Sequence, residues 1–122
     1  MINRRLQSDQ MPNEIRVSVN GNLSRYVKYA LNLLRNNERS IIIKGAGSAT
    51  SRVLHLTEIL KRRVGGLHQV NTISSTLIDC KENNGRQRRV SVFEAQLSID
   101  KPLQENAGYQ EPIQREENFR YK

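Results

Sequence analysis

An Asn-Gly pair at residues 84 and 85 lies between two segments that favour β-strand, and this arrangement constrains the fold more than any other feature. Both central residues of a tight hairpin turn need positive φ, which asparagine and glycine tolerate best. Residues 69–80 are rich in Val, Thr and Ile, residues 81–87 form the expected hairpin, and residues 88–99 predict the return strand. The sequence therefore predicts two long antiparallel strands.

The apolar positions of the return strand change parity along its length. Val90 and Val92 share one parity, whereas Ala95, Leu97 and Ile99 share the other. This slip predicts either a β-bulge or burial of both faces of the strand.

The first half of the chain alternates between strand and helix patterns. Residues 14–19 alternate with Ile15, Val17 and Val19 on one face, which predicts a half-buried strand. Apolar residues from Leu23 to residue 34 recur at helical spacing, and Asn36-Asn37 ends this helix.

The next segments predict a central strand, a glycine loop and a second helix. Residues 40–44 contain three consecutive isoleucines, which predict a central strand that is covered on both faces or lies next to a helix layer. Residues 45–48 form the expected loop, with Ser48 as the helix N-cap. The buried side of the second helix runs from Ala49 to Val64, and Gly65-Gly66 stops it.

These segments predict an α/β fold with the order β-α-β-α-β-β. We expect a two-layer sandwich in which two helices cover one face of a four-stranded mixed sheet. Residues 1–13 are expected to form a flexible arm, residues 14–101 the domain, and residues 102–122 an extended or mobile tail.

The charge of the chain favours a polyanionic partner. The 122 residues contain 20 Lys and Arg against 12 Asp and Glu, a formal net charge of +8. The excess lies in the domain, because residues 1–99 hold 16 basic and 7 acidic residues. Nucleic acid is the expected partner, with a generic soluble basic surface as the alternative.

Other classes of function find little support. The one cysteine, Cys80, excludes an intrachain disulfide, and His55 and His68 have no ligand spacing for zinc. No pair of carboxylates or nucleophilic triad stands out, so we expect neither catalysis nor a metal or cofactor. No long apolar run or N-terminal signal is evident, so we expect no membrane association.

Candidate nucleic-acid-binding residues fall into three groups that carry positive charge or free backbone N–H groups. The hairpin arginines could grip phosphates from the end of a β-ribbon. The glycine loop either binds phosphate at a helix N-terminus or only permits a tight turn. The proposed residues are Arg25, Lys28, Lys44, Gly45, Gly47, Ser48, Arg52, Arg86, Arg88 and Arg89.

The basic triplet at residues 61–63 ends the second predicted helix. We interpret it first as complementing the helix dipole, and second as an RNA or partner contact.

Residues 41–52, 57–60 and 84–91 resemble the Alba family of small basic nucleic-acid-binding proteins, in unbroken order. Residues 58–70 and 108–112 are similar to the larger Alba-type subunits of eukaryotic ribonuclease P and ribonuclease MRP. The resemblance implies the fold predicted above and a dimer formed through the second helix and adjacent strands. It also implies that catalysis belongs to an RNA rather than to this chain.

The chain departs from archaeal Alba proteins before the first helix. They carry a Lys-Lys pair where this chain has Asn20-Gly21, and arginines where it has Ala46 and Ser48. The departure lowers the expectation of generic duplex coating and puts more of the binding on the candidate residues.

The resulting hypothesis is a non-catalytic RNA-binding subunit of a ribonuclease P/MRP-like particle, nuclear or nucleolar, paired with a smaller Alba-like protein. The alternative is a general DNA- or RNA-binding Alba homodimer, and a cytoplasmic location is also open. A third hypothesis, an enzyme that binds a nucleotide at the glycine loop, lacks the Gly-Lys-Ser/Thr sequence of a P-loop.

Overall fold

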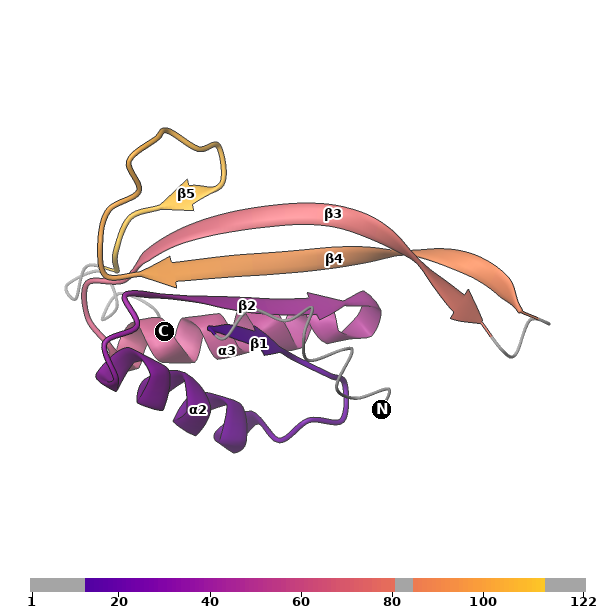
Figure 1. The fold of residues 1–122 in the computed structure, drawn as a ribbon, viewed down its shortest axis with the longest axis horizontal. Coiled ribbons are helices and arrows are strands. Elements are labelled where there is room, and N and C mark those ends of the chain that lie inside the picture. The colour runs from indigo at the N-terminus through magenta and orange to yellow at the C-terminus, as the bar shows by residue number, and fades with distance from the viewer. Residues whose placement is uncertain (1–12, 81–84, 114–122) are drawn as a thin grey trace, which may run out of the picture.

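The computed structural model describes residues 13–80 and 85–113. A parallel strand pair and an antiparallel ribbon form one sheet, and two helices pack beneath it (Figure 1). The elements in chain order are β1 (Glu14–Arg16), α2 (Leu23–Arg35), β2 (Ser40–Ala46), the 3₁₀ turn η1 (Gly47–Ala49), α3 (Thr50–Arg63), β3 (His68–Cys80), β4 (Arg86–Ser98) and β5 (Tyr109–Gln110).

The sheet is mixed, and its strand order is β1-β2-β4-β3-β5. β1 runs parallel to β2, as expected for two strands joined through a helix, and the other pairs are antiparallel. The predicted α/β class with two helices on one face of a mixed sheet is confirmed. The structure adds a fifth strand, β5, to the four that the sequence predicts.

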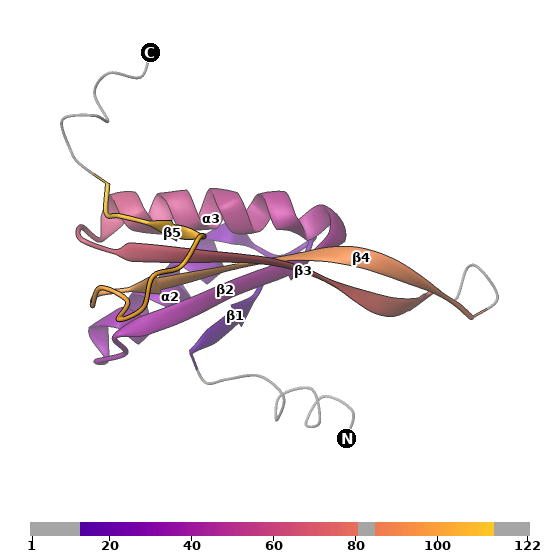
Figure 2. The ribbon, with the colours of Figure 1, turned by 90° about the horizontal axis from the view of Figure 1, so that it is seen from above.

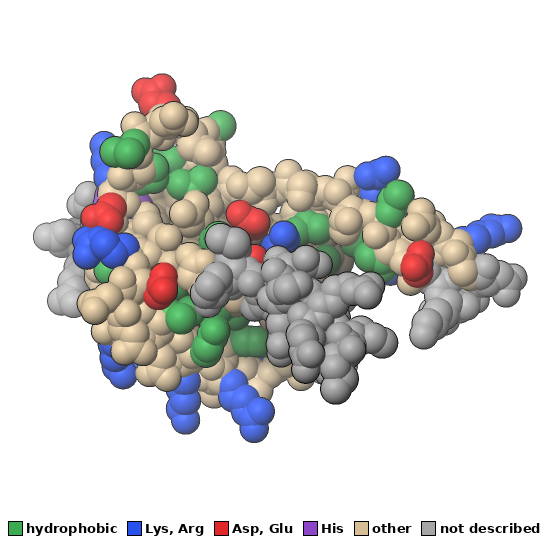
Figure 3. All heavy atoms as spheres, viewed as in Figure 1, with side chains coloured by type: hydrophobic (Ala, Val, Ile, Leu, Met, Phe, Trp, Pro, Cys, Tyr) green, Lys and Arg blue, Asp and Glu red, His purple; other side chains and the backbone are tan. Residues whose placement is uncertain are grey.

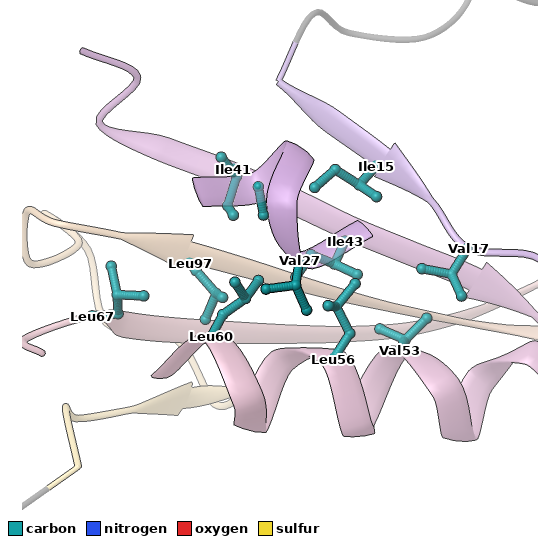
Figure 4. Close-up of a cluster of buried hydrophobic side chains, with 11 residues drawn as sticks. Ile15, Val17, Val27, Ile41, Ile43, Val53, Leu56, Leu60, Leu67 and Leu97 are labelled. Atoms are coloured by element: carbon teal, nitrogen blue, oxygen red, sulfur yellow. The ribbon is translucent and has the colours of Figure 1, made fainter. Parts of the chain in front are cut away.

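The hydrophobic core lies between the sheet and both helices (Figure 4). Alternate residues of β2 and β4 point into it, so that Ile41, Ile43 and Leu97 are fully buried. Val53, Leu56 and Leu60 recur at helical spacing and present one side of α3 to these strands. The period of α3 agrees with the sequence prediction, and the isoleucine run forms a strand next to the helix layer, one of the two predicted arrangements.

The first strand is shorter than predicted. β1 ends at Arg16, and the backbone N–H of Val17 donates one further bond to Lys44 O at 2.8 Å. Ile15 and Val17 are buried, but Val19 lies beyond the ladder and is 49% exposed. The alternation thus predicted the correct face but not the end of the strand.

Ser48 does not cap α3, which corrects the sequence prediction. β2 continues through Gly45 and Ala46, and Gly47–Ala49 forms a 3₁₀ turn before the helix. The N-cap of α3 is Ala49, whose side chain makes no capping bond. The Thr50 hydroxyl instead donates to Gly47 O at 2.9 Å.

β3 and β4 form a ribbon that projects beyond α3 and β2 (Figures 1 and 2). Their register is unbroken from His68↔Ser98 to Cys80↔Arg86, so the predicted bulge is absent from these pairs. Val90, Val92, Ala95 and Leu97 are all buried although the first two face away from the helices. Burial of both faces, the other alternative, accounts for the parity change.

The register at the ribbon tip differs from the one that a two-residue turn centred on Asn84-Gly85 requires. Cys80 pairs with Arg86, whereas such a turn would place residue 83 opposite Arg86. Gly85 has the expected positive φ of 80°. Asn84 lies outside the described residues.

The segment after β4 returns to the sheet. Arg39 donates from Nε and Nη2 to the two carboxylate oxygens of Asp100, at 2.7 and 2.9 Å. This hydrogen bonding lowers the pKa of Asp100 and raises that of Arg39. β5 then pairs with the start of β3. The division into arm, domain and tail stays a prediction, although part of the expected tail contributes a strand.

None of the helices within residues 13–80 and 85–113 has the length and apolar character needed to cross a membrane.

Candidate nucleic-acid interface

A basic corner forms where the loop before α2 meets the start of α3, at the end of the sheet from which the ribbon projects, whereas α2 itself begins beneath the middle of α3 (Figure 1). The guanidinium of Arg52, in the first turns of α3, donates from Nη2 to Gly21 O in the loop before α2. This bond holds the loop before α2 against the start of α3. Sequence positions 21 and 52 are thereby joined.

The loop before α2 is fixed by Tyr26. Its hydroxyl accepts a hydrogen bond from the backbone N–H of Ser18 at 3.0 Å. A Cβ on Gly21 would lie 1.8 Å from the Tyr26 oxygen, so a larger residue there would displace the Tyr26 side chain from its contact with Ser18.

The first turns of α2 carry positive charge where helix electrostatics disfavour it. Asn22 caps the helix by accepting from the Arg25 N–H at 3.2 Å. Arg25 and Lys28 are exposed one turn apart, and the first turn contains no acidic residue. Cations at the positive end of a helix dipole cost a few tenths to about 1 kcal/mol, which a bound anion would offset. In Figure 3, Lys and Arg side chains line the side of the molecule that α2 occupies.

The two glycines of the predicted loop have different surroundings. Gly45 is buried in β2, and a Cβ there would lie 2.6 Å from Val53 Cγ2 and 3.1 Å from Ala49 O. Gly47 is exposed with φ 58°, and open space surrounds it. Gly45 therefore serves packing, whereas Gly47, with the exposed Ser48, presents backbone at the surface.

Lys44 lies apart from the corner. Ile43 and Gly45 on either side of it are buried toward the helices, so Lys44 projects from the opposite face of the sheet. Its partner in the register is Glu94 of β4. An acidic neighbour on the other face makes Lys44 the candidate least associated with the rest.

The three candidate arginines of the ribbon are all exposed. β2 ends opposite Val92, and Arg86 lies six residues farther along β4, or roughly 20 Å at about 3.3 Å per residue. Arg89 lies about halfway and donates from Nη1 to Ser75 Oγ on β3 at 3.0 Å. Arg86 and Arg88 have the other parity and project from the opposite side of the ribbon.

The structure brings most of the candidates together in two groups. The corner group comprises Gly47, Ser48 and Arg52 at the start of α3, with Arg25 after the loop that Arg52 contacts. The ribbon group comprises Arg86, Arg88 and Arg89. Three candidates lie outside both groups: Lys44 is on the opposite face of the sheet, Gly45 is buried in packing, and Lys28 lines a hollow with Ile59 and Arg63 farther along α3. The ribbon begins beside the corner, because Ala46, directly before η1, pairs with Val92. An elongated ligand that lies along the ribbon would reach the corner at the base of the ribbon.

Two further features were missed by the sequence reasoning. Lys61 of the basic triplet is not a solvated cation: it is 7% exposed, and its Nζ donates to Gln69 Oε1 at 2.6 Å. Leu54, Ile73 and Leu77 are 50%, 76% and 49% exposed. Leu54 lies within the predicted second helix, and Ile73 and Leu77 lie on one face of the predicted strand. Nothing in their sequence pattern indicated that these apolar side chains would be exposed.

The described part of the chain contains no group of three or more His, Cys, Asp or Glu side chains arranged to hold a metal ion.

Comparison with known proteins gives consistent matches. A family model described as Alba matches residues 13–77. DNA/RNA-binding protein ALBA1 of Plasmodium falciparum (isolate 3D7) is 33% identical over 120 residues, which cover 88% of this chain and 48% of that protein. DNA/RNA-binding protein ALBA2 of the same organism is 33% identical over 81 residues, covering 65% and 38%. The chain therefore spans about half the length, or less, of these curated relatives.

Two solved structures share the fold. Alba from Thermoplasma volcanium superposes with a TM-score of 0.56 and 25% identity, covering 70% of this chain and 99% of that one. ALBA1 from Trypanosoma brucei gives a TM-score of 0.55 at 19% identity, covering 73% and 70%, a likeness of fold alone.

Gly45→Ala separates packing from ligand contact at the corner. The added methyl meets Val53 and the backbone of Ala49, so we expect a loss of about 1–3 kcal/mol in the free energy of unfolding. Urea denaturation measures this loss, and Gly65→Ala, where open space surrounds the Cβ, is the control. Unchanged stability of the Gly45 variant would contradict the packing role.

Proposed function

The chain belongs to the Alba family, and from this membership we propose that it is a non-catalytic protein that binds duplex DNA or folded RNA through the basic corner and the arginine ribbon. The observation that carries the proposal is the continuity of the two groups: the ribbon begins at Val92, opposite the strand end that leads into η1. The printed names of the Plasmodium relatives, DNA/RNA-binding proteins, support the same class of ligand.

Binding would follow from charge and shape. The ribbon would lie along a groove while its arginines meet phosphates, and the start of α3 with the loop before α2 would meet a phosphate at its base. A double-stranded RNA would be recognised mainly by shape and its 2′-hydroxyls, because its major groove is too narrow for side chains. About six such contacts predict an affinity that falls roughly 10³-fold between 50 and 200 mM salt.

We also propose that the chain acts as a dimer through the outer side of α3 and the adjoining face of β3. Leu54 on α3 lines a hollow of about 410 Å³ with Ser51, His55, Glu58 and Arg62. Ile73 and Leu77 are exposed on the side of β3 that faces the helix layer. A second Alba domain would bury these apolar side chains. Pairing would bring two ribbons into one assembly and increase avidity.

A more specific role, as the larger Alba-type subunit of a ribonuclease P/MRP-like particle in the nucleus or nucleolus, is the second candidate. It rests on the likeness of residues 58–70 and 108–112 to such subunits. In that role the partner would be a smaller Alba-like protein. General DNA/RNA binding by a homodimer, in nucleus or cytoplasm, has the additional support of the curated relatives.

The ribbon arginines are tested by salt dependence. Arg86→Ala with Arg88→Ala should lower the magnitude of the slope of log K against log salt by about 2, because two phosphate contacts are lost. Fluorescence anisotropy with a labelled 20-bp RNA duplex measures the slope. Arg35→Ala with Lys101→Ala removes the same charge from exposed positions outside the corner and ribbon, and should leave the slope unchanged. Equal slopes for both double variants would exclude the ribbon as a contact.

The dimer face is tested by a charged substitution. Leu54→Asp should halve the mass measured by light scattering, since it places a carboxylate among apolar side chains that pairing would bury. Leu103→Asp, at a fully exposed leucine outside this face, should have no effect. If the Leu54 variant keeps the wild-type mass, pairing does not use this face.

Purification of the tagged chain from its native cells separates the two candidate roles. Co-purification of one stable catalytic RNA with a smaller Alba-like protein supports the particle subunit. Recovery of many unrelated RNAs or of DNA, with copies of the same chain, supports the general binder.

A further inference from the structure

The edge of β3 beside α3 holds β5 through contacts that only a particular extended segment could make. Gln110 and Tyr109 pair with Gln69 and Val70, and the Asn71 N–H donates to Gly108 O at 2.9 Å. The backbones approach so closely that a Cβ on Gly108 would lie 2.1 Å from Asn71 O. The edge therefore requires glycine at this point of the bound segment.

An aromatic hydroxyl follows the glycine. Tyr109 Oη and His68 Nδ1 form a hydrogen bond of 2.8 Å. The two rings are stacked, with centroids 5.9 Å apart and planes 21° from parallel. His68 thus contacts both the ring and the hydroxyl of Tyr109.

The buried ammonium of Lys61 contacts the next side chain of β5, that of Gln110. Lys61 Nζ donates to Gln69 Oε1 at 2.6 Å, to Glu58 Oε2 at 3.2 Å and to Gln110 Oε1 at 3.4 Å. A buried ammonium is costly without partners, so each of these oxygens stabilises it. The carboxamide of Gln110 comes from the bound segment and the other two oxygens come from the groove.

The tether that leads to β5 is loosely packed, in contrast to the strand itself. β4 ends at Ser98 and β5 starts at Tyr109, so residues 99–108 connect them. The loop lines a hollow of about 770 Å³, and Leu103 within it is fully exposed. The loop is anchored at both ends: Asp100 is bound by Arg39 at its start, and Asn106 Oδ1 accepts from the Gly108 N–H at 2.8 Å at its end, whereas residues 103–105 between them are exposed.

We propose that this edge is a strand-binding groove whose occupant can be exchanged, so that it accepts residues 103–113 of a second copy of the chain in place of its own. The segment of a second copy has the required glycine, tyrosine and glutamine in the same order. A long, unpacked tether permits such exchange at little cost in native contacts, as in domain swapping. Strand addition to an exposed edge, with side chains read in pockets, is an established mode of recognition.

The groove is formed by β3 and α3 and does not include the candidate nucleic-acid-binding residues. Exchange would link chains through their C-terminal segments, in addition to any pairing through Leu54. Exchange of this segment therefore does not depend on the proposed nucleic-acid binding.

A labelled peptide with the sequence of residues 103–113 tests the groove in the full-length chain. Gly108→Val in the protein prevents its own segment from docking, because the side chain meets Asn71 O, and leaves the groove open. We expect this variant to bind the peptide about tenfold more tightly than the wild-type chain, whose own segment competes at a high effective concentration. Fluorescence anisotropy measures both affinities.

The matched control is the same peptide with the substitution Gly108→Val, which should bind neither protein. His68→Ala in the Gly108→Val protein should also abolish peptide binding, since the Tyr109 contact is lost. Circular dichroism melts check folding, and Tyr109→Ala in the protein serves as a second way to open the groove. Equal affinity for the two peptides, or no binding to either opened variant, would overturn the proposal. The RNA affinity of the opened variants should equal that of the wild type whichever result is found.

Discussion

The contact between α3 and the centre of the sheet determines the placement of everything else in this molecule. Val53, Leu56 and Leu60 pack against Ile43 and Leu97. Gly45 lets the helix start approach the strand more closely than any side chain would allow. Because that approach is fixed, η1 lies where β2 ends, Arg52 reaches Gly21, and the ribbon leaves the sheet beside the corner. Packing in the core thus defines the basic surface without contributing any charge to it.

Much of the fold could be predicted because periodic patterns encode it locally. The isoleucine run of β2, the helical spacing in α3 and the length of β3 each follow from one continuous segment. The start of α3 could not be predicted in the same way. Ser48 has the side chain of an N-cap, but β2 continues past Gly45, and the 3₁₀ turn takes up the intervening residues. Tertiary packing at Gly45 overrides the local capping preference of the serine.

The candidate site was harder to anticipate than the fold. Positive charge identified Arg25, Arg52 and the ribbon arginines, but sequence gives no direct information on which of them lie together. Lys61 illustrates the limit: its run of three basic residues is interpreted from the sequence as complementing the helix dipole, yet the Lys61 side chain is buried against Gln69 and Gln110. A two-residue strand such as β5 has no period to detect. Its contacts join Lys61 and His68 to Gln110 and Tyr109, residues that lie more than 40 positions apart in the sequence.

The unbroken register of the ribbon determines the directions in which its arginine side chains point. Side chains on successive residues point to opposite sides, so Arg88 and Arg89, which are adjacent in sequence, project from opposite surfaces of the same two-stranded arm. Beyond Val92 no third strand and no helix stiffens that arm among the described residues. An arm of this kind, inserted lengthwise between two walls of negative charge, would touch both walls at once.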